Sequence, residues 1–438
     1  MKPNTVLIIG NGMAAVEACR GLRESGFCGE IDILAPDDLP TYNPMLVTYY
    51  AAGLIDYSAM FPYGDSNEVF SRYGVRLHKR SPAVKLSAAG RAVTTSNGET
   101  MRFDKCLIAS GASPLIPPIE RMSTSRILTI RTVDDAMRLK SALEKKPQRV
   151  VVVGASMVGA KLTELFLRAG SDVVLADRAD RIFPLSAHPD CSRIIEERLL
   201  GTGVKLRFST EISRAADTPE GLEICFKNDL EPLYADILLM CAGVRANIGF
   251  VDRDEIETRQ GVLVDCRMES SVPGIYAAGD TAQGTDLSSG AKQIVGILSN
   301  ARRQGYAAGC NMAGANIEYA GELPHNIVHF LGMNFVGIGD PNCCDRCESM
   351  EEGGRFAQIF YRDGKICGAN MLDFFSEAGT FKNALRKSKI LSNDRSGHVS
   401  QAWGNWPDWQ NILARMDPRG FMVLRLRSLG QQSNHISF

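Results

Sequence analysis

The sequence of 438 residues lacks an apolar run of the ~20 residues that are needed to span a bilayer. It also lacks an excess of either charge, because 49 basic and 50 acidic side chains leave a net charge of −1 at pH 7. A nucleic-acid surface or an anionic membrane surface is therefore not indicated. The first apolar segment soon meets glycines and Glu17, without a small-residue cleavage site. We therefore expect the first strand of a cytoplasmic protein there, not a signal peptide.

Twelve cysteines are present, but most are scattered through apolar contexts in a chain long enough to form its own cores. We therefore expect reduced thiols. The one cluster is Cys343, Cys344 and Cys347, and its last two members have metal-ligand spacing. A closed zinc site needs four ligands, and Cys310 or Cys367 would have to complete it in space. We expect no metal and interpret the cluster as a loop with incidental thiols.

The sequence contains one pattern twice: an apolar run, a glycine turn and an amphipathic helix. The runs TVLIIG and RVVVVG lead into GNGMAA (10–15) and GASMVG (154–159). In such a unit the first glycine allows a tight turn, and the second lets the backbone approach a pyrophosphate. The third lets helix and strand pack closely, which leaves the phosphates at the helix N-terminus. We predict an α/β fold with two Rossmann-like dinucleotide-binding domains.

Each unit continues into a second strand that ends near an acidic residue. IDILAPDD supplies Asp37 or Asp38, and SDVVLADR supplies Asp177. Asp177 has nearly the ~20-residue spacing at which a carboxylate accepts a hydrogen bond from a ribose hydroxyl. Such a carboxylate favours NADH over NADPH, whereas Arg178 and Arg181 would suit the 2′-phosphate of NADPH. A solvated loop acid is the alternative for Asp177.

Four further stretches are similar to motifs of a known superfamily. In chain order they are FDKCLIASG (103–111), IRTVDDA (130–136), LLMCAGVRAN (238–247) and GIYAAGD (274–280). Together with the two turns, they resemble the pyridine nucleotide–disulfide oxidoreductase superfamily over roughly residues 4–385. The segment DDLPTYNPMLVTYYAAG (37–53) is similar to the flavin-side region of one branch. That branch contains the ferredoxin and rubredoxin reductases and the flavin module of assimilatory nitrite reductase.

The resemblance implies an FAD-binding domain split in sequence (1–117 and 244–318) by an NAD(P)-binding domain (118–243). A C-terminal α+β interface domain (319–390) would follow, with strands, a turn at Asp363-Gly364 and a helix over 376–391. This domain often mediates dimer or partner contacts in the branch, so we expect a homodimer or a partner complex. The tail (391–438) has an unknown role and holds Trp403, Trp406 and Trp409. They would anchor a partner or pack on the chain itself.

The resemblance also carries functional residues over to this sequence. Those implied to bind FAD are Gly10, Gly12, Ala15, Asp37, Val84, Gly111, Arg131, Gly279 and Asp280. Asp280 would accept from a ribitol hydroxyl, and its place after an apolar strand also predicts a helix cap. Those implied to bind NAD(P) are Gly154, Ser156, Gly159, Asp177 and Gly243. Ser156 replaces a glycine, but its small side chain fits a phosphate turn.

Two positions depart from the branch beside the flavin–nicotinamide contact. Thr48 stands where a lysine is common, and Lys161 stands where a glutamate follows the second turn. Losing that acid removes a charge-assisted hydrogen bond worth about 1.5–3 kcal/mol. A cation there would stabilise an anionic reduced flavin, unless Lys161 points into water. Residues 38–53 contain no cysteine, so the superfamily's thiol–disulfide chemistry is not expected.

The leading hypothesis is an FAD-dependent oxidoreductase in which NAD(P)H reduces the flavin. The flavin would then pass electrons to a small redox protein of the ferredoxin or rubredoxin type, or to another acceptor. The alternative is a flavoprotein subunit of a multi-component amine, opine or glycine-type dehydrogenase or oxidase with a vestigial nicotinamide site. Thr48 and Lys161 favour this alternative, whereas Asp177 and its glycine turn favour the first. A non-catalytic flavin-bound sensor or assembly factor is a third hypothesis.

Overall fold

The computed structural model describes residues 5–64, 66–120, 126–227 and 231–393. The chain divides into two compact units, Met1–Phe375 and Ser376–Phe438. The described residues of the second unit all belong to helix α8 (Phe375–Asn393), where a helix was predicted. The three tryptophans of the tail lie outside the described residues. Within the described ranges, none of the helices has the length and apolarity that a membrane crossing requires.

The first large sheet is parallel, and four of its five strands are buried along most of their length, whereas the edge strand β3 is partly exposed. Continuous apolar strands such as TVLII suit this position, because helices or other layers cover both faces of a parallel sheet. The chain leaves the sheet after its fourth strand and returns much later to add the fifth at an edge. In spatial order the strands are β19 (Ile275–Ala277), β7 (Lys105–Ile108), β1 (Thr5–Ile9), β2 (Glu30–Leu34) and β3 (Val75–His78).

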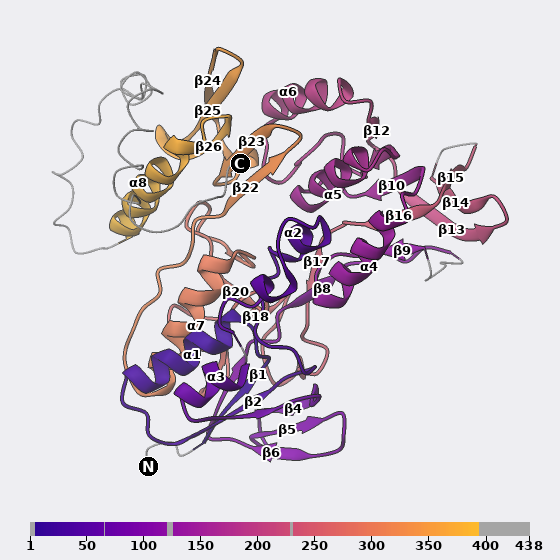
Figure 1. Cartoon of the computed structure of the whole chain (residues 1–438). Helices are drawn as coiled ribbons and strands as arrows, with labels where there is room; N and C mark the ends of the chain where they lie inside the picture. Colours follow the sequence, from indigo (N-terminus) through magenta and orange to yellow (C-terminus); the bar gives the residue numbers. More distant parts are fainter. Residues whose placement is uncertain (1–4, 65, 121–125, 228–230, 394–438) are drawn as a thin grey trace, which may run out of the picture. The chain divides into compact units, whose positions relative to one another are not determined.

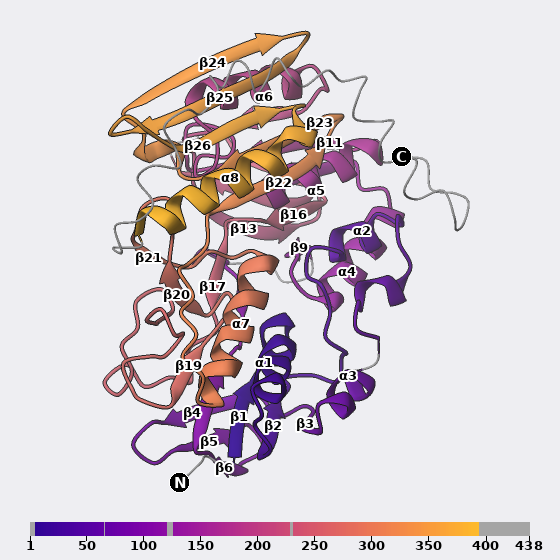
Figure 2. The ribbon, with the colours of Figure 1, turned by 90° about the vertical axis from the view of Figure 1, so that its left-hand side faces the viewer.

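Helices α1 (Met13–Glu24) and α7 (Leu298–Met312) lie side by side, as Figures 1 and 2 show. Their backbones touch through glycines. A Cβ added to Gly305 would lie 2.2 Å from the Ala14 carbonyl oxygen, and one added to Gly309 would lie 2.2 Å from that of Ala18. Any larger residue at these two positions would push the helices apart, so the contact requires glycine.

The second large sheet is also parallel and is formed by a later part of the chain. Its order is β12 (Lys205–Arg207), β11 (Asp172–Ala176), β10 (Arg149–Val153), β16 (Ile237–Met240) and β9 (Ile127–Leu128). Helices α4 (Val133–Glu144), α5 (Met157–Arg168) and α6 (Pro189–Leu200) belong to the same part. Two parallel sheets with helices confirm the predicted α/β fold class.

The third large sheet is antiparallel. Its order is β22 (His325–Phe330), β23 (Met333–Ile338), β26 (Lys365–Leu372), β25 (Arg355–Arg362) and β24 (Arg346–Glu352). The predicted turn between β25 and β26 is present, with positive φ at both Asp363 and Gly364. The short 3₁₀ helix η2 (Pro341–Cys343) precedes β24.

The remaining elements are short. Three small sheets contain β4 (Ala83–Ser87), β5 (Ala92–Thr95) and β6 (Thr100–Arg102); β13 (Ile212–Thr218), β14 (Gly221–Phe226) and β15 (Leu233–Ala235); and β18 (Val262–Leu263), β20 (Ala282–Thr285) and β21 (Lys292–Gln293). A two-stranded ribbon pairs β8 (Ala112–Pro114) with β17 (Val244–Ala246). The short helices are α2 (Val47–Ala51), η1 (Tyr57–Met60) and α3 (Ser66–Arg72).

We expect Gly305→Ala to destabilise the protein by about 1–3 kcal/mol, because its methyl group would overlap the Ala14 carbonyl. The measurement is the midpoint of thermal unfolding. The matched control is Gly249→Ala, where an added Cβ meets no described atom within 4 Å and φ is not positive. Equal midpoints for the two variants would contradict the close contact between α1 and α7.

Candidate functional site

The first glycine turn is fixed by a neighbouring carbonyl group. Gly10 follows β1, has φ +104°, and donates its N–H to the Leu34 carbonyl oxygen at 2.8 Å. A Cβ on this residue would lie 2.3 Å from the Ala109 carbonyl oxygen, which follows β7. Only glycine meets both conditions, the left-handed backbone and the close carbonyl.

The turn leads into a helix N-terminus with space beside it. Gly12 is the N-cap of α1, and no described side chain accepts a hydrogen bond there. An added Cβ on Gly12 would meet no described atom within 4 Å, whereas Ala15 is fully buried. The first N–H groups of a helix need acceptors and carry partial positive charge. This end of α1 therefore fits an anion such as a pyrophosphate.

Asp280 lies beside this turn and pairs with Arg131 at 2.5 Å; the two side chains are 15% and 26% exposed. Gly279, which precedes Asp280, has φ +79°, and a Cβ added to it would lie 3.6 Å from the Ala14 Cβ of α1. The predicted helix cap at Asp280 is wrong, because β20 follows directly and α7 begins only at Leu298. The chain turns at Gly279, and the charge of the Asp280 carboxylate is balanced by Arg131, which is 149 residues away in the sequence.

The other residues predicted around this turn lie on different elements. Asp37 is half-buried and accepts from the Leu39 N–H at 2.9 Å; burial, with Asp134 and Asp38 nearby, raises its pKa. Val84 is 52% exposed at an irregularity of β4, where the ladder with β5 skips it. The Gly111 carbonyl accepts hydrogen bonds from elsewhere in the chain, while its Cα borders open space.

The second glycine turn repeats the backbone geometry of the first. Gly154 has φ +114° and donates to the Ala176 carbonyl oxygen at 2.8 Å. A Cβ on it would lie 2.3 Å from the Cys241 carbonyl oxygen. One on Gly159 would lie 1.9 Å from the carbonyl of Gly154 itself. The third small residue of this turn is therefore required for helix and turn to pack. Gly243, at φ +113°, follows the strand β16 and borders open space.

Ser156 has a definite role at this turn. It is the N-cap of α5: its hydroxyl accepts from the Gly159 N–H at 3.3 Å and donates to the Cys241 carbonyl at 3.2 Å. The replacement of glycine thus adds a helix cap without obstructing the turn. Asp177 also contacts the turn, because its carboxylate accepts from Ala155 N–H at 2.6 Å and from Ala179 N–H at 2.7 Å.

Lys161 does not point into water. Its side chain is 13% exposed, and the ammonium group contacts the Glu164 carboxylate at 2.6 Å and the His329 carbonyl oxygen at 3.1 Å. Glu164 is 1% exposed, pairs also with Arg168 at 2.8 Å and accepts from the Leu331 N–H at 3.0 Å. The solvent alternative for Lys161 is wrong, because a buried carboxylate one turn further along α5 holds it.

Thr48 lies on the short helix α2 and donates to the Met45 carbonyl oxygen at 3.5 Å. Its neighbour Tyr49 carries a ring whose centroid is 5.7 Å from the Lys161 ammonium group. The structure therefore brings the α2 segment, which contains Thr48, next to Lys161, so the two positions that depart from the branch lie in neighbouring elements. Within this segment, Tyr49 is the residue whose ring lies over the lysine ammonium group.

Sequence reasoning missed Glu164 and the pairing of Arg131 with Asp280. A signal for Glu164 was present, since an acid three residues after Lys161 lies within the apolar stretch LTELF of one helix. The Arg131–Asp280 contact spans 149 residues, and spacing along the chain does not predict it.

Comparisons with known proteins agree with these features. The family described as pyridine nucleotide-disulphide oxidoreductase matches residues 4–305. The NADH-dependent phenylglyoxylate dehydrogenase subunit epsilon of Aromatoleum evansii is 29% identical over 401 residues, which cover 90% of this chain and 94% of that protein.

Two solved structures share the fold. The water-forming NADH oxidase of Lactobacillus brevis has a TM-score of 0.82 at 20% identity, over 96% of this chain and 99% of that one. The reductase in the covalent putidaredoxin reductase–putidaredoxin complex has a TM-score of 0.80 at 19% identity, over 88% and 93%.

We expect Glu164→Gln to destabilise the protein more in the presence of Lys161 than in the Lys161→Met background, with a coupling of at least about 0.5 kcal/mol. The neutral amide retains an acceptor for Leu331 but leaves the lysine charge half-buried and unbalanced. Thermal unfolding of the four proteins measures this coupling. In the exposed pair Arg193–Glu197, Glu197→Gln should change little. Additive effects of the two substitutions on α5 would contradict the buried pair.

Proposed function

The chain belongs to the pyridine nucleotide-disulphide oxidoreductase family, and we propose that it is an FAD-dependent oxidoreductase that uses NAD(P)H and delivers electrons to a protein partner. The supporting observation is that two glycine turns of the same backbone geometry follow β1 and β10, the central strands of two parallel sheets. Ligands of such sheets bind outside the carboxyl ends of the strands. The proposal also adopts the domain division that the resemblance implies, at residues 117, 243, 318 and 390.

FAD would be held at the first turn. Its pyrophosphate would accept from the N–H groups at the start of α1, beside Gly10 and Gly12. Asp280 would bind a flavin-side hydroxyl, and Arg131 would hold that carboxylate in position. Asp37 and the backbone at Val84 would contact the adenosine end, while Ala15, Gly111 and Gly279 allow close packing. When bound, the flavin supplies the capacity to accept two electrons and release them singly.

NAD(P)H would be held at the second turn. Gly154 and Gly159 shape the loop, Ser156 caps its helix and Gly243 leaves room opposite. The Asp177 carboxylate is already fixed by the turn through the Ala155 N–H, so its direction is set before a ribose binds. A carboxylate there repels a 2′-phosphate, which favours NADH.

The contacts of Lys161 support use of the nicotinamide site. Its charge is balanced by Glu164, so it does not present an isolated cation beside a flavin. The argument for a vestigial site rested on such a cation, together with Thr48 and the missing glutamate. Thr48 and Lys161 would then shape the edge where flavin and nicotinamide meet, through Tyr49, without taking part in proton transfer.

The names of two similar proteins support the proposal that the electron acceptor is a protein. The relative from Aromatoleum evansii is a subunit of an NADH-dependent dehydrogenase, and a structural neighbour was solved in a covalent complex with putidaredoxin. We infer that the acceptor is a small redox protein of the ferredoxin or rubredoxin type, or a redox subunit of a larger complex, and that the protein forms a homodimer or joins such a complex. The twelve cysteines, which all lie within the described residues, form no disulfide bond in the structure, and this supports a cytoplasmic location.

Anaerobic titration of the yellow protein with NADH should bleach the flavin absorbance, and added rubredoxin or ferredoxin should then be reduced. Gly159→Ala should retain flavin that dithionite reduces but NADH does not, because its methyl group overlaps the Gly154 carbonyl. Bleaching by an amine, opine or glycine substrate, with no response to either nucleotide, would establish the alternative dehydrogenase subunit. Slow reduction by every donor would indicate a sensor.

Asp177→Asn should reduce the preference for NADH over NADPH by about tenfold, which corresponds to ~1.4 kcal/mol. The amide keeps an acceptor for the Ala155 N–H but does not repel a 2′-phosphate. The ratio of kcat/KM for the two nucleotides measures the change. Asp172→Asn, at the exposed start of the strand β11 that Asp177 follows, is the control and should leave the ratio unchanged. An unaltered ratio in Asp177→Asn would remove this residue from nucleotide selection.

A further inference from the structure

The segment 181–188, between β11 and α6, contains one strained residue. Phe183 has φ +52°, a left-handed conformation that a bulky residue rarely adopts, and it precedes Pro184, which favours extended backbone before it. The Phe183 carbonyl oxygen accepts from the N–H groups of Ser186 at 2.8 Å and Ala187 at 2.7 Å, which closes a tight turn. Such a conformation costs free energy and persists only where surrounding contacts impose it.

The ring of Phe183 packs against two phenylalanines of the antiparallel sheet. Its centroid is 5.5 Å from that of Phe330 on β22 and 5.0 Å from that of Phe335 on β23. Aromatic rings at such distances attract each other beyond the effect of the area that they bury. Phe183 is 2% exposed and its two partners are fully buried. The ring therefore attaches the segment to the C-terminal sheet and opposes relaxation of the backbone.

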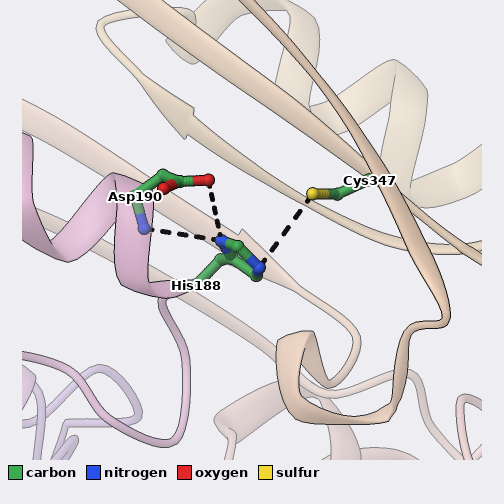
Figure 3. Close-up of side chains that lie close together, drawn as sticks. All are labelled: His188, Asp190 and Cys347. Atoms are coloured by element: carbon green, nitrogen blue, oxygen red, sulfur yellow. Dashed lines mark hydrogen bonds and ion pairs between the residues drawn. The ribbon is translucent and has the colours of Figure 1, made fainter.

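The end of the segment is attached to the same sheet. Asn370 of β26 is fully buried, donates to the Ser186 carbonyl oxygen at 2.8 Å and accepts from the His188 N–H at 2.7 Å. Figure 3 shows the His188 ring between Asp190, whose N–H donates to Nδ1 at 3.4 Å, and Cys347 of β24, whose sulfur is 4.0 Å from Nε2. The position of the segment thus follows the position of the sheet.

On its other side, Phe183 holds the second glycine turn. Its N–H donates to the Ala155 carbonyl oxygen at 2.9 Å, and the Ala155 N–H donates to Asp177 at 2.6 Å. Ala155 is fully buried and precedes Ser156, the N-cap of α5. In the planar trans peptide between them, the Ser156 N–H points opposite to the Ala155 carbonyl. By fixing this carbonyl, Phe183 also fixes the direction of the Ser156 N–H.

We propose that Phe183 is a positioning residue for NAD(P)H, which couples the C-terminal sheet to the Ser156 N–H and so to the nucleotide pyrophosphate. This inference rests on the proposed use of NAD(P)H at the second turn. N–H groups at the start of a helix bind phosphate groups when they point at them. None of the described residues accepts a hydrogen bond from the Ser156 N–H. A change in the sheet would therefore alter nucleotide affinity without changing the chemistry at the flavin.

The first test compares Phe183→Ala with Met268→Ala. Met268 is a matched control, because it is also apolar and buried with positive φ, but it belongs to the core around the first parallel sheet. Phe183 belongs to the core around the second. Both substitutions should lower the midpoint of thermal unfolding. Only Phe183→Ala should weaken the binding of NAD⁺ to the oxidised holoenzyme, because without its ring the backbone would relax and release the Ala155 carbonyl.

We expect the dissociation constant of NAD⁺ to rise about tenfold in Phe183→Ala, the effect of one lost hydrogen bond to a charged group. Isothermal titration calorimetry measures it. Phe183→Leu keeps part of the packing and should have an intermediate constant. Phe335→Leu, a change in the sheet itself, should raise the KM for NADH and leave the rate of flavin reduction at saturating NADH unchanged, as expected when only binding is lost.

The outcomes separate this inference from the proposed function. Equal dissociation constants in Phe183→Ala and the wild type, or equal losses of affinity in Phe183→Ala and Met268→Ala, would overturn the inference and leave the proposed function intact. A wild type that binds NAD⁺ but is not reduced by NADH would contradict the proposed function, while a weaker Phe183→Ala would still support the inference. A wild type that binds neither nucleotide would overturn both.

Discussion

A backbone carbonyl that lies close to a glycine determines the geometry of both glycine turns. The Ala109 oxygen would lie 2.3 Å from a Cβ on Gly10, and the Cys241 oxygen 2.3 Å from one on Gly154. In each case the carbonyl follows the strand next to the turn, and the glycine N–H bonds to the strand on the other side. Three parallel strands thus define one turn, and the helix that follows takes its direction from them. The chain forms this arrangement twice.

Charges near the turns are held in pairs. Arg131 balances Asp280 at the first turn, and Lys161 with Arg168 balances Glu164 at the second. Burying an unpaired charge costs free energy. Each of these side chains is therefore held beside its partner. For Lys161 the pairing weakens the electric field around the ammonium group, because a cation paired with a buried carboxylate affects neighbouring groups less than an unpaired cation does.

Local pattern accounted for much of the fold. The runs TVLIIG and RVVVVG became β1 and β10, the glycine turns followed them, and the hairpin at Asp363-Gly364 formed as predicted. These features depend on residues close in sequence. The helix cap expected at Asp280 does not form. The chain turns at Gly279 instead, and the Asp280 carboxylate pairs with Arg131, which is 149 residues away in the sequence. The contact between His188 and Cys347 was equally beyond sequence spacing, because the two residues are 159 positions apart in the chain.

The glycine contact between α1 and α7 has a consequence for synthesis on the ribosome. Its partners are far apart in the chain: Gly21 and Cys310, which share a hydrogen bond, are separated by 289 residues. The strands of the second parallel sheet all lie within 127–240, so they emerge together and can pair while α7 is still untranslated. Until α7 is synthesised, the face of α1 that carries small residues has no α7 to pack against. The first parallel sheet is therefore completed after the second, because its edge strand β19 (Ile275–Ala277) follows residue 240.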